Sequence, residues 1–129
     1  IFLEGMLLKP NMVVAGQKHP KRASPEDVAL STVRALKNCV PAAIPGVAFL
    51  SGGQSDIEAT ANLNAINRLG GPWALTFSYG RALQTAALKT WSGMPSNVLD
   101  AQAAFTHRAH MNALATQGQW TEMEERAAP

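Results

Sequence analysis

The chain alternates between short apolar runs and longer stretches in which apolar residues recur every three or four positions. A short apolar run is typical of a buried strand, whereas the three-to-four spacing is typical of an amphipathic helix. The pattern predicts strands over residues 2–9, 46–50 and 73–79. It predicts helices over about residues 25–38, 55–69, 81–91 and 97–117.

Capping signals support the boundaries of the first two helices. Ser24 precedes Pro25 and two acidic residues, the arrangement favoured where a helix begins. Ser55 and Glu58 have the spacing of a capping box, in which each side chain satisfies a backbone N–H at the helix start. Gly70, Gly71 and Pro72 then break the chain before the third predicted strand.

Strands that alternate with helices predict an α/β fold with a parallel sheet. A complete TIM (β/α)8 barrel needs about 250 residues, so three units form either a small open sheet or part of such a barrel. The chain opens at Ile1, without Met, inside an apolar run. That start favours the barrel interpretation, with the last three βα units and a C-terminal helix in residues 1–118. Residues 119–129 are expected to be a polar, flexible tail.

Composition narrows the possible classes of protein. Of 129 residues, 47% are hydrophobic and 16% charged, which is typical of a folded globular domain. The formal net charge of +2 and the lack of a basic block argue against nucleic-acid binding. No apolar run approaches the roughly 18 residues that a membrane span needs. The single cysteine, Cys39, excludes an internal disulfide and fits a reducing compartment such as the cytoplasm.

Lys9 ends the first apolar run and is the candidate catalytic residue. Burial of an ammonium is costly, so such a group either reaches water or loses its proton and becomes a nucleophile. A deprotonated lysine amine can form a Schiff base with a carbonyl substrate. The alternative is an ordinary surface lysine whose stem covers the strand end.

Two turns after the second and third strands have the chemistry of an anion site. Ser51, Gly52 and Gly53 offer a hydroxyl and bare backbone N–H groups. Gly80 and Arg81 follow the third strand, where a helix start and a guanidinium favour phosphate. The alternative is that the glycines serve only the turns and Arg81 is a solvated charge.

A metal site has little support in the sequence. His107 and His110 lie three positions apart on the last predicted helix, but no Asp, Glu or Cys accompanies them. They are interpreted as surface or partly packed histidines, and no metal or cofactor is expected.

Three long motifs, taken together, resemble the class I fructose-bisphosphate aldolases. The motifs are Leu3-Glu4-Gly5-Met6-Leu7-Leu8-Lys9-Pro10-Asn11-Met12-Val13, Phe49-Leu50-Ser51-Gly52-Gly53-Gln54-Ser55 and Pro72-Trp73-Ala74-Leu75-Thr76-Phe77-Ser78-Tyr79-Gly80-Arg81-Ala82-Leu83-Gln84. They occur in order within residues 2–118. The resemblance implies a (β/α)8 barrel of which these are the sixth to eighth units.

The resemblance also implies a lyase of glycolysis and gluconeogenesis. Lys9 would form the imine through which fructose 1,6-bisphosphate is cleaved to glycerone phosphate and glyceraldehyde 3-phosphate. The C1-phosphate would be held by Ser51, Gly52, Gly53, Ser78, Gly80 and Arg81. The family needs no metal, is often tetrameric, and is cytoplasmic or, in some members, located in plastids.

The sequence departs from the family in two respects. The family's general acid/base glutamate and additional active-site lysines belong to earlier strands, and residues 122–125 do not resemble the family's end. We therefore expect the isolated chain to lack turnover. The alternative to the aldolase function is a catalytically silent fragment that only binds sugar phosphate or serves as a scaffold.

Overall fold

The computed structural model describes residues 1–127 and contains a three-stranded parallel sheet with five α-helices. The strands are β1 (Leu7–Leu8), β2 (Gly46–Phe49) and β3 (Ala74–Phe77). The helices are α1 (Pro25–Cys39), α2 (Asp56–Leu69), α3 (Arg81–Trp91), α4 (Val98–Thr116) and α5 (Glu122–Arg126). Two short 3-10 helices cover Leu3–Gly5 and Pro95–Asn97.

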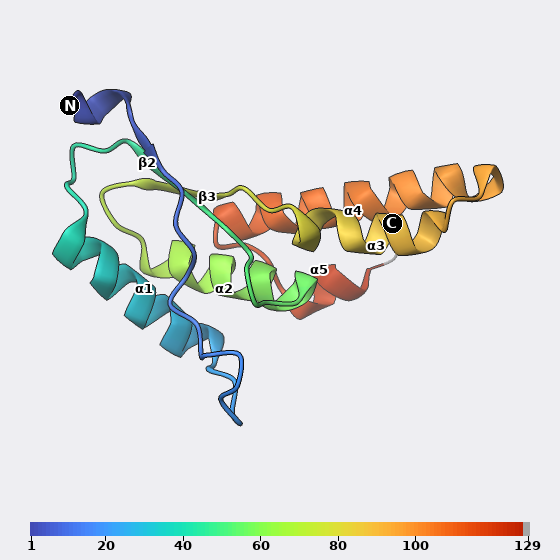
Figure 1. Cartoon of the computed structure of the whole chain (residues 1–129), viewed down its shortest axis with the longest axis horizontal. Coiled ribbons are helices and arrows are strands. Elements are labelled where there is room, and N and C mark those ends of the chain that lie inside the picture. The colour runs from blue at the N-terminus through green and yellow to red at the C-terminus, as the bar shows by residue number, and fades with distance from the viewer. Residues whose placement is uncertain (128–129) are drawn as a thin grey trace.

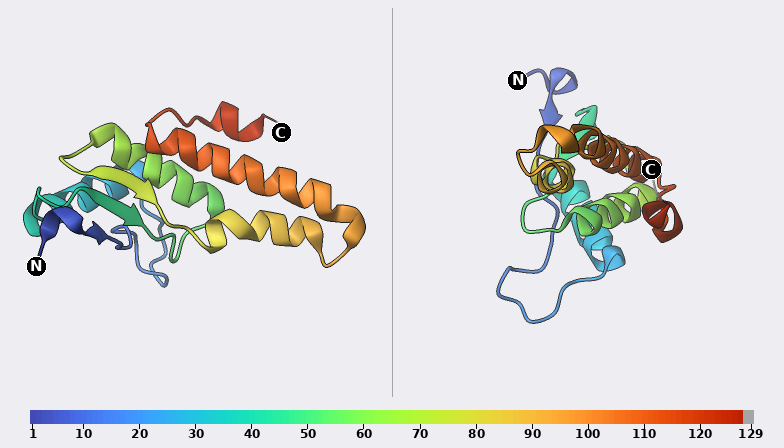
Figure 2. Two further views of the ribbon diagram at one scale, coloured as in Figure 1. Left: turned by 90° about the horizontal axis from the view of Figure 1, so that it is seen from above. Right: turned by 90° about the vertical axis from the view of Figure 1, so that its right-hand side faces the viewer.

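The strands lie in chain order, β1-β2-β3, and all run in the same direction. Leu8 pairs with Val47, and Val47 pairs with Leu75, so these three residues form one row across the sheet. Helices α1 and α2 pack side by side along one face of the strands, while α3 and α4 form an antiparallel pair that extends beyond the sheet (Figures 1 and 2). The strand–helix alternation predicted from the sequence is confirmed.

The hydrophobic core lies between the sheet and helices α1 and α2. Val47, Phe49 and Leu63 are completely or almost completely buried there. Both predicted helix starts are confirmed, because Ser24 accepts a hydrogen bond from the Asp27 N–H and the Ser55–Glu58 capping box is complete. These local contacts fix where α1 and α2 begin, and with them the positions of the preceding turns.

The predicted first strand is longer than the structure allows. Residues 3–5 form a 3-10 turn, in which the N–H of Gly5 donates to the carbonyl of Phe2, and the strand covers only Leu7 and Leu8. The reason lies in the pairing, since Leu7 is opposite Gly46, the first residue of β2. The residues before Leu7 have no neighbouring strand within residues 1–127, so their backbone N–H and C=O groups form hydrogen bonds with one another.

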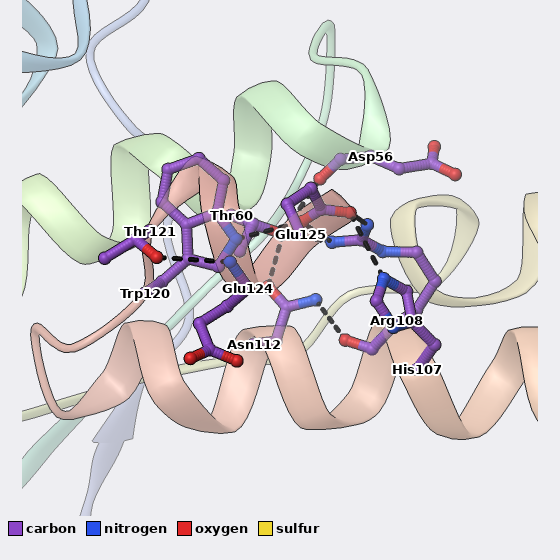
Figure 3. Close-up of polar contacts among 9 residues, drawn as sticks. All are labelled: Asp56, Thr60, His107, Arg108, Asn112, Trp120, Thr121, Glu124 and Glu125. Carbon is purple, nitrogen blue, oxygen red and sulfur yellow. Dashed lines mark hydrogen bonds and ion pairs between the residues drawn. The ribbon is translucent and has the colours of Figure 1, made fainter. Parts of the chain in front are cut away.

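The segment after residue 118 contains a short helix, α5, over residues 122–126, and the expectation of a flexible tail over residues 119–129 stays a prediction. Glu125 accepts two hydrogen bonds from the guanidinium of Arg108 on α4 and one, of 2.9 Å, from the indole of Trp120 (Figure 3). Arg108 also donates to the hydroxyl of Thr60 on α2 at 2.9 Å. A buried polar network therefore ties α5 to α4 and α2. The division of the chain at residue 118 stays a prediction, and residues 128–129 lie outside the described part.

The face of the sheet opposite α1 and α2 is left uncovered by residues 1–127. Leu7 is 71% exposed and Leu50 37%, and Ala74 and Thr76 of β3 are exposed as well. In a closed barrel this face would line the interior, and the outer edges of β1 and β3 would pair with further strands.

We expect the 129-residue chain to self-associate, because exposed apolar side chains and unpaired strand edges favour contact between copies. Sedimentation velocity should show a weight-average sedimentation coefficient that rises with protein concentration. Leu7→Lys places a charge on the uncovered face and should reduce the rise. A monodisperse monomer that unfolds cooperatively would contradict this expectation.

Candidate functional site

The carboxyl ends of the three strands meet at one edge of the sheet. Beyond the regular strands, Asn11 forms a parallel bridge with Leu50, and the N–H of Leu50 donates to the carbonyl of Pro10 at 2.8 Å. The N–H of Ser78 donates to the carbonyl of Phe49 at 2.8 Å. Asn11, Leu50 and Ser78 therefore lie level with one another, and the turns that follow them start from the same edge.

Lys9 lies on the uncovered face, about two residues before this edge. Successive strand side chains point to opposite faces, and Leu8 packs against the core while Leu7 and Lys9 are exposed. The bridge between Asn11 and Leu50 preserves the register, so Lys9 is opposite Ala48. Within residues 1–127 the Lys9 ammonium forms no ion pair or hydrogen bond, which leaves its amine accessible to a ligand over the sheet.

The loop after β2 closes as a β-turn over residues 51–54. The N–H of Gln54 donates to the carbonyl of Ser51 at 3.2 Å, and Gly53 has φ +76°. That left-handed conformation at the third position is typical of a type II turn and favours glycine. Ser51 is half-buried, and its hydroxyl makes no hydrogen bond within the described residues, so it is available to a ligand.

The turn is held from outside by side chains of the loop that follows Lys9. The Asn11 side-chain amide donates to the carbonyl of Gly52 at 3.1 Å. Arg22 donates to the carbonyl of Gly53 at 2.9 Å and to the carboxylate of Glu58, also at 2.9 Å. No local sequence pattern marks Asn11 or Arg22 as a site residue, because their partners lie 41 and 31 residues away in the chain.

The end of β3 is anchored by Tyr79. Its phenol is buried and donates to the carbonyl of Ala59 on α2 at 2.9 Å. Burial disfavours the phenolate and raises the pKa of Tyr79 well above its ordinary value. Tyr79 is therefore a neutral structural anchor that fixes the residues on either side of it.

Helix α3 begins directly after this anchor. Gly80 is its N-cap and supplies no side-chain cap, so the first backbone N–H groups of the helix remain open to an acceptor. Arg81 is exposed and forms no ion pair within residues 1–127. A helix start with an adjacent guanidinium favours a bound anion.

The structure thus brings most of the predicted residues to one edge of the sheet. Ser51, Gly52 and Gly53 follow β2, Ser78, Gly80 and Arg81 follow β3, and Lys9 lies just before the edge on the uncovered face. The two histidines are elsewhere. On α4, His107 Nε2 lies 3.5 Å from Oε1 of Glu125, and His110 is exposed. Within the described residues, no group of three or more potential metal-ligating side chains occurs.

Three parallel βα units whose strands end at one edge, with Lys9 on the uncovered face and two glycine-containing turns beside it, indicate the class of fold. The arrangement is that of part of a (β/α) barrel, a fold in which active sites lie at the carboxyl ends of the strands. None of the helices in residues 1–127 has the length and apolar character that crossing a membrane would require.

Comparisons with known proteins identify the family. The family model for class I fructose-bisphosphate aldolases matches residues 1–129. Fructose-bisphosphate aldolase C of Mus musculus is 58% identical over 122 residues, and the non-muscle-type aldolase of Lethenteron camtschaticum is 57% identical over 122 residues. Each alignment covers 93% of this chain and 34% of the relative. The chain belongs to the class I fructose-bisphosphate aldolase family.

A solved structure shows the same fold. The fructose-bisphosphate aldolase of Plasmodium falciparum, crystallised with TRAP and a small-molecule inhibitor, superposes with a TM-score of 0.90 at 55% identity. The match covers 94% of this chain and 35% of that one. The chain therefore has the last three βα units of the aldolase barrel and spans about a third of the length of its relatives.

Proposed function

We propose that this chain carries the imine-forming lysine and the C1-phosphate subsite of a fructose-1,6-bisphosphate aldolase. The observation that carries the proposal is the placement of Lys9 on the uncovered face, just before the edge at which both turns begin, within a chain of this family. Fructose 1,6-bisphosphate and triose phosphates are the proposed ligands. The cytoplasmic location and the homotetrameric assembly that the resemblance implies belong to the same proposal.

Lys9 would act on the ketone carbon of the sugar phosphate. Its unprotonated amine adds to the carbonyl, and uptake of a proton with loss of water gives a protonated imine. A base then removes the proton of the C4 hydroxyl, C4 becomes the aldehyde carbon, and the electron pair of the breaking bond between C3 and C4 moves toward the imine nitrogen to form an enamine. Glyceraldehyde 3-phosphate leaves first. Protonation of the enamine and hydrolysis of the resulting imine release glycerone phosphate and restore the lysine.

The two turns would hold the phosphate on the carbon next to the ketone. Backbone N–H groups near Gly53 and at the start of α3 are neutral donors, whereas Arg81 supplies a full positive charge. Fixing this phosphate places the ketone over the uncovered face on which Lys9 lies. In this arrangement the turns orient the substrate and Lys9 performs the covalent step.

A second candidate function is binding of sugar phosphate without turnover. It is favoured by the surroundings of Lys9, because within residues 1–127 no carboxylate forms an ion pair or hydrogen bond with its amine. Protonation and deprotonation steps of the aldol cleavage need a positioned acid or base. Adduct formation at Lys9 without release of glyceraldehyde 3-phosphate is the expected result for this candidate.

Arg81→Ala should weaken the binding of glycerone phosphate by about 2 kcal/mol, the typical cost of losing a hydrogen bond to a charged group. Isothermal titration of the wild type and the variant measures the change. Lys89→Ala, which removes an exposed cation from the other end of α3, is the matched control and should bind normally. Equal affinity of Arg81→Ala and the wild type would place the phosphate elsewhere.

A further inference from the structure

The two central carbonyls of the turn over residues 51–54 are both held by side chains from the loop between β1 and α1. Asn11 binds the carbonyl of Gly52 and Arg22 binds that of Gly53. These donors lie 41 and 31 residues away in the sequence. The segment that directly follows Lys9 therefore clamps the turn proposed to bind phosphate.

Holding the carbonyls also fixes the N–H groups. A peptide unit is planar and trans, so the C=O of one residue and the N–H of the next point in opposite directions. With the Gly52 carbonyl turned toward Asn11, the Gly53 N–H points away from it. With the Gly53 carbonyl turned toward Arg22, the Gln54 N–H points to the carbonyl of Ser51, with which it is hydrogen-bonded.

The turn needs such anchors because of its composition. Glycine adopts both left- and right-handed backbone conformations at little cost, so two adjacent glycines leave the peptide between them free to rotate. A rotation of that peptide would redirect the Gly53 N–H by about half a turn. Asn11 holds the carbonyl of that peptide and so sets the direction of the Gly53 N–H, whereas Arg22 holds the carbonyl of the next peptide and so restrains the turn as a whole.

Arg22 makes the stronger of the two contacts. Its Nε and one terminal nitrogen both donate to Oε1 of Glu58, while the same terminal nitrogen donates to Gly53. The other oxygen of Glu58 accepts the N–H of Ser55 in the capping box of α2. The Arg22 and Glu58 side chains are 42% and 29% exposed, so their ion pair alone contributes little. Its importance lies in the geometry, since it joins the turn to a rigid helix start.

We propose that Arg22 is a positioning residue that tethers the turn over residues 51–54 to the start of α2 and thereby raises the affinity of the site for a phosphate group. This inference rests on the proposed function for its phosphate part. Arg22 does not touch the substrate. It acts through the carbonyl of Gly53 and through Glu58, and it links the loop after Lys9 to the phosphate turn.

The test compares the wild-type chain with Arg22→Ala, Arg22→Lys and the control Arg126→Ala. Arg126 also forms an ion pair with a glutamate, Glu122, but their side chains are 81% and 78% exposed. Both residues belong to α5, far in the sequence from the turn over residues 51–54. Hydrogen–deuterium exchange of peptides spanning residues 51–54, without ligand, reports the order of the turn. Titration with inorganic phosphate measures the affinity for phosphate. The rate of borohydride trapping, measured over a range of glycerone phosphate concentrations, gives the half-saturating concentration and the limiting rate separately.

Arg22→Ala should speed exchange over residues 51–54 and weaken phosphate binding about tenfold, equivalent to about 1.4 kcal/mol. It should raise the half-saturating concentration of glycerone phosphate by a similar factor and leave the limiting trapping rate unchanged. Arg22→Lys offers one ammonium for two acceptors and should rescue part of the loss. The melting temperature of Arg22→Ala should match that of Arg126→Ala.

Two results would overturn the inference: exchange and affinity that match the wild type, or a loss that Arg126→Ala shares. Failure of the wild type to bind phosphate would instead refute the proposed phosphate site. If Arg22→Ala still speeds exchange over residues 51–54 in that case, the anchoring role is supported and the effect on affinity is refuted.

Discussion

Lys9→Met is expected to abolish the borohydride-trapped adduct with glycerone phosphate. The wild type should gain the mass of one adduct and the variant none. Methionine keeps a stem of similar length without an amine, so the imine cannot form while the strand keeps its packing. Intact-mass spectrometry after borohydride treatment measures the adduct, and peptide mapping locates it. Phosphate affinity should be almost unchanged, because the phosphate turns belong to other strands.

Lys18→Met is the matched control, since Lys18 is an exposed lysine of the same loop. Its adduct should equal that of the wild type. An adduct that persists in Lys9→Met would assign the nucleophile to another lysine. Absence of an adduct in the wild type, with normal phosphate binding, would favour the function of sugar-phosphate binding alone.

Glu125→Ala is expected to lower the free energy of unfolding by about 3 kcal/mol, because it leaves the Arg108 guanidinium buried without its counter-charge. The Arg108 side chain is 5% exposed and that of Glu125 10%. Urea denaturation at low protein concentration measures the change. Glu122→Ala removes the carboxylate of an ion pair whose side chains are 78% and 81% exposed, so it should cost less than about 1 kcal/mol. Equal costs for the two variants would contradict the role assigned to the network.

The same carboxylate should make stability depend on pH. Burial acts to raise the pKa of Glu125, but hydrogen bonds from Arg108 and Trp120 and the charges of Arg108 and His107 outweigh it and hold the pKa below its usual range. A depressed folded-state pKa stabilises the protein above the pKa of the unfolded chain, about 4.3, and this contribution is lost as pH falls through the folded value. The stability difference between wild type and Glu125→Ala should therefore shrink on acidification below that pH.

The helices could be predicted closely because their signals are local. Ser24, Ser55 and Glu58 act within four residues of the helix starts that they cap, and α1 and α2 begin where the sequence indicates. The first strand could not be delimited in the same way, because its start is decided by where β2 begins to pair. Apolar character alone does not reveal that residues 2–6 have no strand to pair with in the described part of the chain.

The order in α5 depends on a contact between distant residues. Glu125 appears in the sequence as one of several acids in a polar tail, and only its contact with Arg108, 17 residues earlier, makes it a buried anchor. In the candidate site, too, some residues can be predicted from local sequence and others depend on contacts between distant residues. The strand-end residues follow from the topology of a parallel sheet, whereas Asn11 and Arg22 bind across 41 and 31 residues.

The order β1-β2-β3 has a consequence for folding during synthesis. Each strand pairs with the one synthesised just before it, so a growing sheet always keeps one edge at its first strand and one at its newest. Adding a unit moves the second edge without removing it, and only the meeting of the first and last strands of a closed barrel removes both. In full-length relatives, in which these units lie at the C-terminal end, the nascent chain therefore remains prone to wrong pairing until they leave the ribosome.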